Sequence, residues 1–395
     1  MCECVTSWMI VTFLGADQRE QKWQSDFMAI FRIIRAALGA SATLTMLAAC
    51  SGGSSPTQFS PGGPGVGGPS VQRQTASGGR TGNSVLPPTI ARISRKPITT
   101  ASFMDPDAKG KPLIFVSDAA DGVIDIYPQA GENQKMVGQI TGLAQPQGIT
   151  TDKNGNLYVA DTNNSNVLVY APPYTGAPKM TINDAHEFPA DVAVSSAGVV
   201  AVTNICDAPQ CRLNTGNVEI YAKGSTKSCA TVSDSAFNFT RVMFAEFDKD
   251  GVLYIDGMNG GYQTSFGLVT GGCNATSITN LGYIYTVSFP GAIQIDKAGN
   301  IAFCDEYNQV VDTFAPPVGN SFGDPVSTTP LTGSVSPIGI AVLASGTNIY
   351  AADSSGSGLA EEYQYPAGGA AENSIAVGGQ PIGIAVTPPL TKENN

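Results

Sequence analysis

A polar turn that ends in glycine recurs five times in this sequence and sets the length of its structural unit. The turn glycines are Gly155, Gly198, Gly251, Gly299 and Gly346, and successive ones lie 43 to 53 residues apart. Repeats of this length are typical of β-propellers, in which four strands form one blade. A single blade cannot bury its apolar faces, so the repeat predicts several blades packed against one another.

Residues 146–170, PQGITTDKNGNLYVADTNNSNVLVY, contain the signals of a blade in their clearest form. A short apolar strand (148–150) leads into a polar turn, and further apolar strands follow at 157–160 and 167–170. Alternating apolar residues between turns rich in Asn, Gly and Asp are the pattern of antiparallel strands. The opening strand recurs as GITTD, DVAVS, MFAEFD, AIQID and GIAVL. A proline sits just before four of these five strands, where it costs no ladder hydrogen bond.

The two ends of the repeat are incomplete in complementary ways. Residues 113–137 supply three strands without an opening strand, whereas residues 380–386 (QPIGIAV) form an opening strand with no strands after it. We expect the last strand to complete the first blade, because closing the ring pairs edges that would otherwise aggregate. The predicted fold is all-β: a six-bladed β-propeller of four-stranded antiparallel blades, closed by pairing of the C-terminal strand with the first blade.

The pattern PxGIxxDxxGNLYVADxxNxxVxVY resembles the blades of NHL-repeat propellers and of their gluconolactonase-type relatives. The resemblance covers roughly residues 113–387 and implies the propeller fold. It does not by itself imply one function, since a propeller frame carries many activities. In gluconolactonase-type enzymes a divalent metal is held by acidic and amide side chains from different blades. Their early glutamate has no equivalent here, because the strand GIAVTPP contains none.

The first 49 residues have the features of a leader that is removed on export. Residues 1–27 carry no repeat, and Met28 begins a more conventional secretion signal, so we expect translation to start there. Two arginines form a positive region, residues 36–46 form an apolar one, and Leu-Ala-Ala precedes Cys50. This site resembles the bacterial lipobox, in which the cysteine is acylated and becomes the N-terminus. The alternatives are an ordinary signal peptide or a membrane helix, for which the apolar run is short.

Composition sets the remaining domain boundaries. Residues 50–100 begin with the predicted lipidated cysteine and continue as a flexible linker rich in Gly, Ser and Pro. Residues 101–387 form the propeller, and residues 388–395 form a C-terminal tail. From residue 101 onward the chain has 28 acidic and 12 basic residues, which argues against nucleic acid as a partner.

The predicted location is the bacterial cell envelope, with a lipid anchor in the membrane and a monomeric propeller exported from the cytoplasm. Ser51 follows the predicted lipidation site. In a Gram-negative bacterium this residue directs the anchor to the outer membrane.

Five cysteines follow the predicted lipidation site, and their odd number leaves at least one thiol free. Cys206 and Cys211 flank the loop CDAPQC, which an exported protein is expected to close with a disulfide. Cys229 and Cys273 lie in successive blades and are a second candidate pair, with free thiols as the alternative. Cys304, in the apolar strand IAFCD, is expected to be a buried free thiol.

Six equivalent positions at the ends of the second strands should meet on one face of the ring. They are Asp118, Asp161, Asn204, Gly257, Asp305 and Asp353. Four carboxylates and an amide near a channel mouth could coordinate a hard cation such as Ca²⁺, which prefers oxygen ligands. Alternatively, each side chain accepts hydrogen bonds from amides of its own loop, as in Asx turns.

Aromatic residues in the loops are the other candidate contacts. Both tryptophans, Trp8 and Trp23, fall in the leader, so stacking against a sugar would depend on Tyr and Phe. Tyr262 and Tyr307 are therefore counted with the residues of the loop face as a candidate binding surface. Residues 256–273 are predicted to form a long glycine-rich loop, of the kind that commonly carries binding residues on a rigid frame.

Two functions remain open at this level. The first is a cell-envelope lipoprotein whose propeller binds or scaffolds a protein, peptide or glycan. The second is a divalent-metal-dependent hydrolase or lactonase of the gluconolactonase type. A missing ligand set and a single histidine, His186, disfavour the second. We expect no catalytic residues and no cofactor other than Ca²⁺ bound by the carboxylates.

Overall fold

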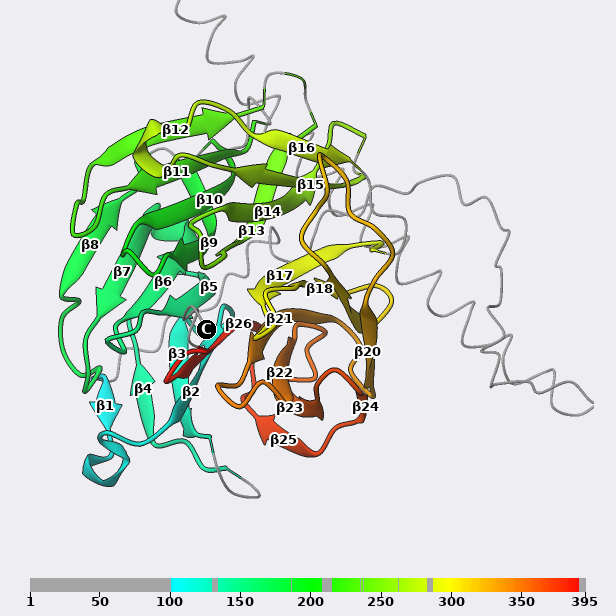
Figure 1. The fold of residues 1–395 in the computed structure, drawn as a ribbon. Coiled ribbons are helices and arrows are strands. Elements are labelled where there is room, and N and C mark those ends of the chain that lie inside the picture. Colours follow the sequence, from blue (N-terminus) through cyan, green and yellow to red (C-terminus); the bar gives the residue numbers. More distant parts are fainter. Residues whose placement is uncertain are drawn as a thin grey trace, which may run out of the picture. The chain divides into compact units, whose positions relative to one another are not determined.

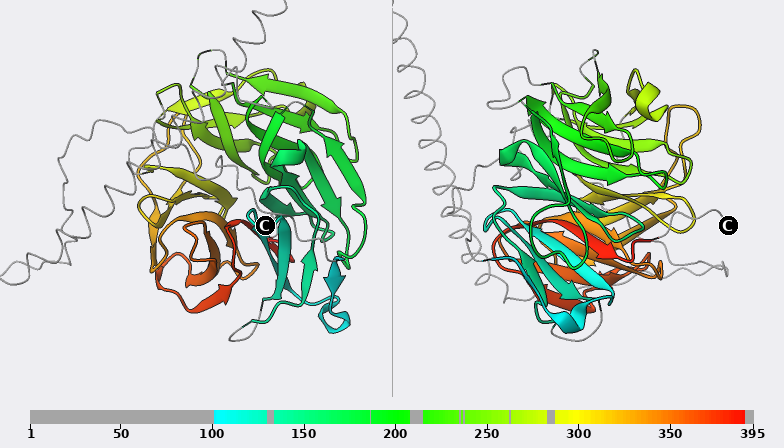
Figure 2. Two further views of the ribbon diagram at one scale, coloured as in Figure 1. Left: turned by 180° about the vertical axis from the view of Figure 1, so that it is seen from behind. Right: turned by 90° about the vertical axis from the view of Figure 1, so that its left-hand side faces the viewer.

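Six antiparallel sheets surround a common axis, each extending outward from the centre (Figure 1). The computed structural model describes residues 101–390 apart from 130–133, 186, 208–214, 235, 237, 262 and 283–286. Figure 2 gives two further views of the ring, from behind and from the side. The predicted leader, lipidation site and linker, residues 1–100, all lie outside the described residues. In the described part of the chain, no helix has the length and hydropathy needed to cross a membrane.

Five of the blades are built from strands that follow one another in the sequence, the first strand lying innermost and the last outermost. The second blade consists of β5 (Pro146–Thr151), β6 (Leu157–Asp161), β7 (Asn166–Tyr170) and β8 (Met180–Asn183). The third consists of β9 (Glu187–Val194), β10 (Val200–Asp207), β11 (Asn217–Tyr221) and β12 (Ser228–Ser233). The fourth consists of β13 (Arg241–Phe247), β14 (Leu253–Met258), β15 (Thr264–Val269) and β16 (Thr279–Gly282). The fifth consists of β17 (Pro290–Ile295), β18 (Ile301–Asp305), β19 (Val310–Phe314) and β20 (Ser327–Thr332). The sixth consists of β21 (Pro337–Val342), β22 (Asn348–Asp353), β23 (Leu359–Gln364) and β25 (Asn373–Ala376).

The first blade joins the two ends of the propeller. Its inner strand is β26 (Pro381–Thr387), and β2 (Leu113–Asp118), β3 (Val123–Pro128) and β4 (Gly138–Ile140) follow outward. Leu113 lies opposite Thr387, and the antiparallel pairing continues along both strands. A short additional strand, β1 (Phe103–Met104), extends this blade beyond β4. The predicted six-bladed fold and its closure by the C-terminal strand are confirmed.

Burial decreases from the axis outward. Every residue of the inner strands β13 and β21 is buried, because blades pack against both faces of each inner strand. The outer strands β12 and β25 instead show exposed residues alternating with more buried ones. This period of two is expected where only one face of a strand packs on its neighbours.

The blades are held together by apolar contacts between neighbouring sheets. Phe266 of the fourth blade and Phe303 of the fifth meet edge to face, with ring centroids 4.7 Å apart. Phe303 also contacts Phe314 and Phe322 within its own blade. A further link joins the fifth and sixth blades, since β24 (Gly369–Ala370) pairs in parallel with the outer strand β20.

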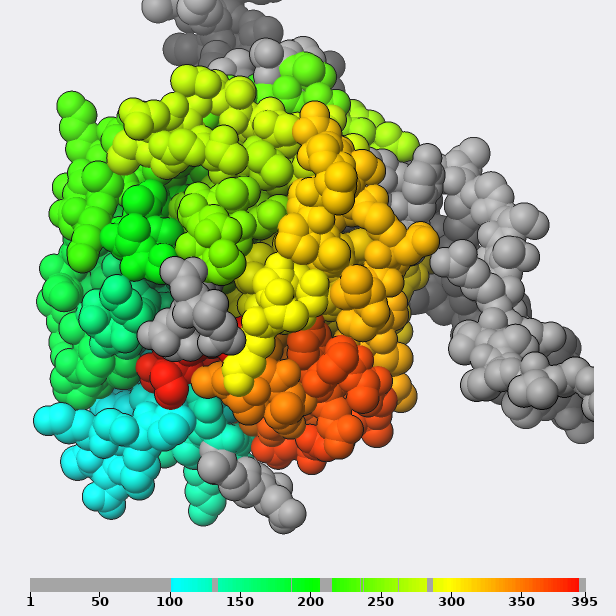
Figure 3. Space-filling view, viewed as in Figure 1, coloured from blue at the N-terminus to red at the C-terminus, as the bar shows by residue number. Residues whose placement is uncertain are grey.

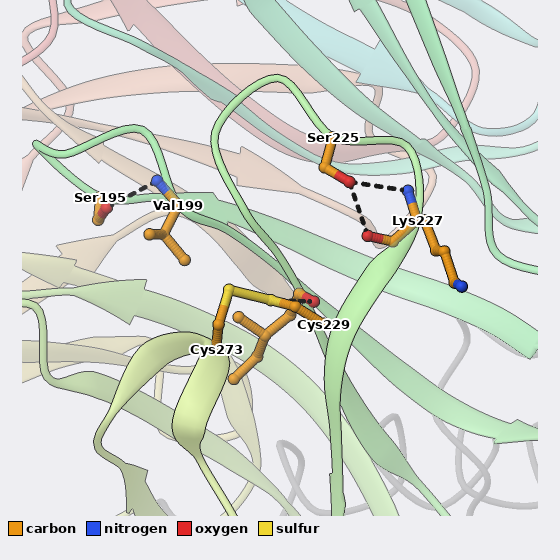
Figure 4. The surroundings of a disulfide bond; sticks show 7 residues. Ser195, Val199, Ser225, Lys227, Cys229 and Cys273 are labelled. Atoms are coloured by element: carbon orange, nitrogen blue, oxygen red, sulfur yellow. Dashed lines mark hydrogen bonds between the residues drawn. A yellow bond between two sulfur atoms is a disulfide. The ribbon is translucent and has the colours of Figure 1, made fainter.

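One disulfide joins the outer edges of the third and fourth blades (Figure 4). Cys229 on β12 is bonded to Cys273, which lies in the short 3-10 helix η4 (Gly272–Asn274). This bond confirms the second predicted pair. Cys206 is also disulfide-bonded, while its predicted partner Cys211 lies outside the described residues. Cys304 is the buried free thiol that was expected, and its Sγ lies 3.3 Å from the carbonyl oxygen of Pro337.

The prediction of a long loop at residues 256–273 is wrong. Half of this segment belongs to the strands β14 and β15, which pair directly along their length. Two of the glycines that suggested a loop serve close packing within these strands instead. A Cβ at Gly257 would overlap the backbone of Arg241, and one at Gly267 would lie 2.9 Å from the ring of Phe239.

Candidate functional site

The six positions predicted to share one face occupy equivalent places in the six sheets. Five of them lie opposite the first or second residue of the inner strand, and Asn204 lies opposite the third residue of β9. The pairs are Asp118 with Pro381, Asp161 with Pro146, Asn204 with Pro189, Gly257 with Val242, Asp305 with Pro290, and Asp353 with Pro337. The strand register shifts between each of these pairs and a neighbouring pair, as it does at a β-bulge. We call these six residues the strand-start ring.

Asp161 shows what the carboxylates of the strand-start ring do. It is fully buried, and the backbone amides of Ala144 and Gln145 donate to its Oδ1 at 2.9 and 2.8 Å. Asn164 donates to Oδ2 at 2.7 Å. The bonded groups lie in the chain segment that leads into the inner strand and in the turn after the second strand. The carboxylate therefore ties the start of the inner strand to the end of the second strand.

The same bonding recurs at the other aspartates of the ring. Asp305 accepts hydrogen bonds from the amides of Ser288, Phe289, Tyr307 and Asn308 and from the side chain of Asn308. Asp118 accepts from the amides of Ala120, Asp121 and Gln380. Asp353 accepts from the amides of Val335 and Ser355 and the hydroxyl of Ser334. The Asx-turn alternative thus describes Asp118, Asp305 and Asp353, which accept from amides of the loop that follows each of them. Asp161 instead accepts from backbone amides of the segment before its inner strand.

Burial and hydrogen bonding shift the pKa values of these acids in opposite directions. Loss of solvent raises the pKa of Asp118 and Asp161, and the amide hydrogen bonds offset part of that rise. At Asp353 burial also acts to raise the pKa, but the bonds from Ser355, Val335 and Ser334 outweigh it and the pKa is lowered. Among the described residues, no group of three or more His, Cys, Asp or Glu side chains is placed to hold a metal ion.

The remaining predicted contacts are more scattered. Asn204 is fully buried and donates through Nδ2 to Oδ1 of Asn217 at 3.0 Å. Tyr307 is 65% exposed and follows Asp305 on the face of the ring. Tyr262 and His186 lie outside the described residues. The described part of the predicted surface therefore offers one exposed aromatic ring beside carboxylates that are already bonded.

Several other carboxyl groups are buried in surroundings that disfavour their charged form. Desolvation raises the pKa of Asp125, Asp191 and Glu306 to about 7 and that of Asp184 to about 6. Asp191 lies on an inner strand, where the amide of Ala245 donates to it at 3.1 Å, and its carboxylate leaves no room for a Cβ on Gly148. The sequence pattern did not single these acids out, because each replaces an ordinary residue of one blade.

We expect these buried acids to make the protein less stable as the pH rises. Because their folded pKa values exceed the unfolded ones, the native state binds more protons between about pH 4 and 7, and stability is lost across that window. Thermal melts followed by circular dichroism should give a melting temperature that falls from pH 4.5 to 7.5. Asp125→Asn, which keeps the acceptor for Gln139, should raise the melting temperature at pH 7.5 and leave it almost unchanged at pH 4.5. A melting temperature that rises across this interval would contradict the assignment.

A cavity of about 390 Å³ opens on the opposite face, where the inner strands end. Each of the six inner strands contributes to it, through Thr150, Val194, Glu246, Gln294, Ala341 and Ala385. This is the face turned toward the viewer in Figure 3, and the last described residues, coloured red, lie near its centre. Leu390, a residue of the predicted tail, is buried and lines the cavity. The volume is within the range of small-molecule sites in proteins.

From the channel mouth the cavity extends outward between the second and third blades. Its outer walls are the β5–β6 turn with Lys153 and Asn154, the start of β8 with Lys179, and loops of the third blade with Ser196 and Lys223. The stem of Lys223 lies over Gly198, where an added Cβ would be 3.0 Å from its Cγ and Cδ. Sequence reasoning missed this site because its residues come from ordinary turns that only the ring brings together.

Comparisons with known proteins agree with the fold. Residues 143–170, in and just before the second blade, match the family model of the NHL repeat. No curated protein is similar enough in sequence to be matched. A chain of the nidogen/laminin complex is similar with a TM-score of 0.53 at 14% identity, over 70% of this chain and 98% of that one. A protein of unknown function from Bacteroides caccae is similar with a TM-score of 0.52 at 10% identity, over 70% of this chain and 99% of that one. The chain is thus a six-bladed β-propeller with an NHL repeat at its second blade.

Proposed function

We propose that this protein is a binding module of the bacterial cell envelope that holds its ligand in the cavity at the channel mouth. The observation that carries the proposal is the convergence of all six inner strands on one cavity of about 390 Å³. A cavity formed by every blade is rigid, because each wall is fixed by its own sheet. Rigid concave sites favour binding, since little conformational entropy is lost when the ligand enters.

The strand-start ring supports the binding function less directly. Its carboxylates accept hydrogen bonds from the backbone, so their part is to hold the strands of each blade together. No observation among the described residues favours the alternative of a metal-dependent hydrolase. The nidogen/laminin complex is an assembly of proteins that contains a chain of similar fold, which is compatible with a propeller of this shape serving as a binding module.

The cavity can be blocked without touching the core. Asn154 is exposed in the β5–β6 turn and lines the cavity, so Asn154→Trp should obstruct it. Ala298 occupies the matching place in the β17–β18 turn of the fifth blade, away from the cavity. Both residues donate a backbone hydrogen bond at 2.8 Å to the aspartate that begins their turn. Ala298→Trp is therefore a matched control.

We expect the protein to bind members of a panel of peptides, glycans and small acids, with binding detected as a rise in melting temperature. Asn154→Trp should abolish the rise for the bound member, whereas Ala298→Trp should preserve it. A ligand bound equally well by both variants would place the binding site elsewhere.

The envelope location rests on the predicted acylation of Cys50. Cys50→Ser should move the protein from the membrane fraction to the soluble fraction of the cell envelope, because the anchor can no longer be attached. The measurement is an immunoblot of the separated fractions. Unchanged association with the membrane would contradict the lipid anchor while leaving the binding site of the propeller untouched.

A further inference from the structure

We propose that the cavity takes an amphipathic acid, with an aliphatic body at the channel mouth and a carboxylate or phosphate over the lysines of the outer walls. This inference rests on the proposed binding function and names the chemistry of the ligand. It follows from an uneven distribution of apolar and charged side chains within the cavity.

The inner part of the cavity is mainly aliphatic. Its lining includes Ile149, Val194, Ile295, Val342, Ile384 and Leu390. Below the mouth, the free space between the inner strands is a separate cavity with a volume of only about 20 Å³. The aliphatic part of a ligand therefore ends at the mouth. Its binding there removes apolar surface of both the ligand and the cavity lining from water.

The outer part of the cavity carries three lysines, Lys153, Lys179 and Lys223. In the described part of the chain, none of their ammonium groups has a hydrogen-bond or ion-pair partner within reach, and the one ion pair found joins Lys249 to Asp250. Three of the nine described lysines thus gather at one cavity, although the chain from residue 101 onward has 28 acidic and 12 basic residues. They favour an anion at this end of the ligand.

The cavity wall also carries two acidic residues, which leave the three lysines in excess by one charge. Asp152 turns its carboxylate into its own turn, where the amide and side chain of Asn156 and the amide of Asn154 donate to it at 2.7 to 2.9 Å. Glu246 lies at the channel, where the amide of Phe247 and the side chain of Gln294 donate to it. Both carboxylates are thus engaged by protein donors, and the ammonium groups are not.

The lining also argues against a neutral sugar as the main ligand. Tyr158 is the one aromatic residue among the described side chains that line the cavity, and it is 8% exposed. Stacking of sugar rings against aromatic faces therefore has little surface available. An aliphatic chain needs no such surface, since it gains free energy from burial alone.

The test compares ligands that share a chain and differ in charge. Sodium octanoate and 1-octanol are titrated by calorimetry into the full chain carrying Cys50→Ser, which avoids competition from lipid or detergent. We expect octanoate to bind about tenfold more tightly than octanol, and raised salt to remove most of that difference, because exposed charges are screened.

The lysines are tested as a group against a matched control. Replacing Lys153, Lys179 and Lys223 together by Gln should weaken octanoate binding by about tenfold and leave octanol unchanged. The control replaces Lys109, Lys111 and Lys135, which are exposed in the first blade away from the cavity, and alters net charge equally. It should leave both affinities unchanged. Equal melting temperatures of the two variants will show that the fold is intact.

Two results would overturn the inference. Equal affinity for octanoate and octanol, insensitive to the lysines, would show a cavity that binds neutral apolar groups and would leave the proposed binding function standing. Failure of both compounds to bind would reject an amphipathic acid as ligand. The proposed function itself fails on a separate result, namely a ligand that Asn154→Trp does not displace.

Discussion

A chain that ends at Gln380 should lose the cooperative unfolding transition of the propeller. This truncation removes β26, the inner strand of the first blade, and leaves β2 without its partner. It also exposes the two neighbouring inner strands, β5 and β21, which β26 contacts. Ile382, Ile384 and Val386 are buried, and fully burying an aliphatic side chain contributes about 1.5–3 kcal/mol. The summed loss is comparable with the whole stability of a domain, about 5–15 kcal/mol.

Polar contacts across the closure add to this loss. The hydroxyl of Thr151 donates to the carbonyl oxygen of Val386 at 2.6 Å, and the amide of Gly383 donates to the hydroxyl of Ser117 at 2.7 Å. The measurement is far-ultraviolet circular dichroism during heating. A chain that ends at Leu390 keeps β26 and is the control, which should melt as the full chain does. Cooperative melting of the shorter chain within a few degrees of the control would show that closure contributes little.

The second large effect is expected at the strand-start ring. Asp305→Ala should lower the free energy of unfolding by at least about 3 kcal/mol, because it leaves several buried amides without an acceptor. Asp305 is fully buried and bonds to four backbone amides before and after its strand. Urea denaturation of the full chain measures the loss. We expect a shift of the midpoint with little change in its slope.

Asp296 provides the matched comparison within the same blade. Its carboxylate accepts from the amides of Ala298 and Asn300, but it lies in the half-exposed turn between β17 and β18. Water can replace these bonds, so Asp296→Ala should cost only about 1 kcal/mol. Equal losses in the two variants would mean that burial of Asp305 is not what makes its bonds important.

The repeat predicted the fold because every blade restates the same spacing. The alignment of turn glycines placed Asp161, Asp305 and Asp353 at equivalent positions, and the strand register confirms the equivalence. The alignment did not predict which groups the carboxylates of these aspartates bind. The donors to Asp161 precede the inner strand by sequence, and the donor from Gln380 reaches Asp118 from the other end of the propeller.

The candidate site was harder to predict for a physical reason. Lys153, Lys179 and Lys223 occupy turns in which a lysine is an ordinary exposed residue, and nothing local marks them as a group. Their proximity to Ile384 and Leu390 depends on the closed ring, which brings residues more than two hundred positions apart to one cavity. At residues 256–273, by contrast, glycines led to the prediction of a site-bearing loop where two strands are found. Gly257 and Gly267 serve close packing there, but a strand that contains them has the glycine content of a loop.

The position of β26 also has a consequence for the time during which the chain is made. The edge of β2 at residues 113–118 stays without its partner until residues 381–387 have been synthesised. An unpaired edge can join a strand of another molecule for as long as it remains open. The time between the synthesis of β2 and that of β26, a strand of seven residues, therefore determines how long each new molecule is exposed to aggregation. A delay between these two strands should cost more yield than an equal delay before β2.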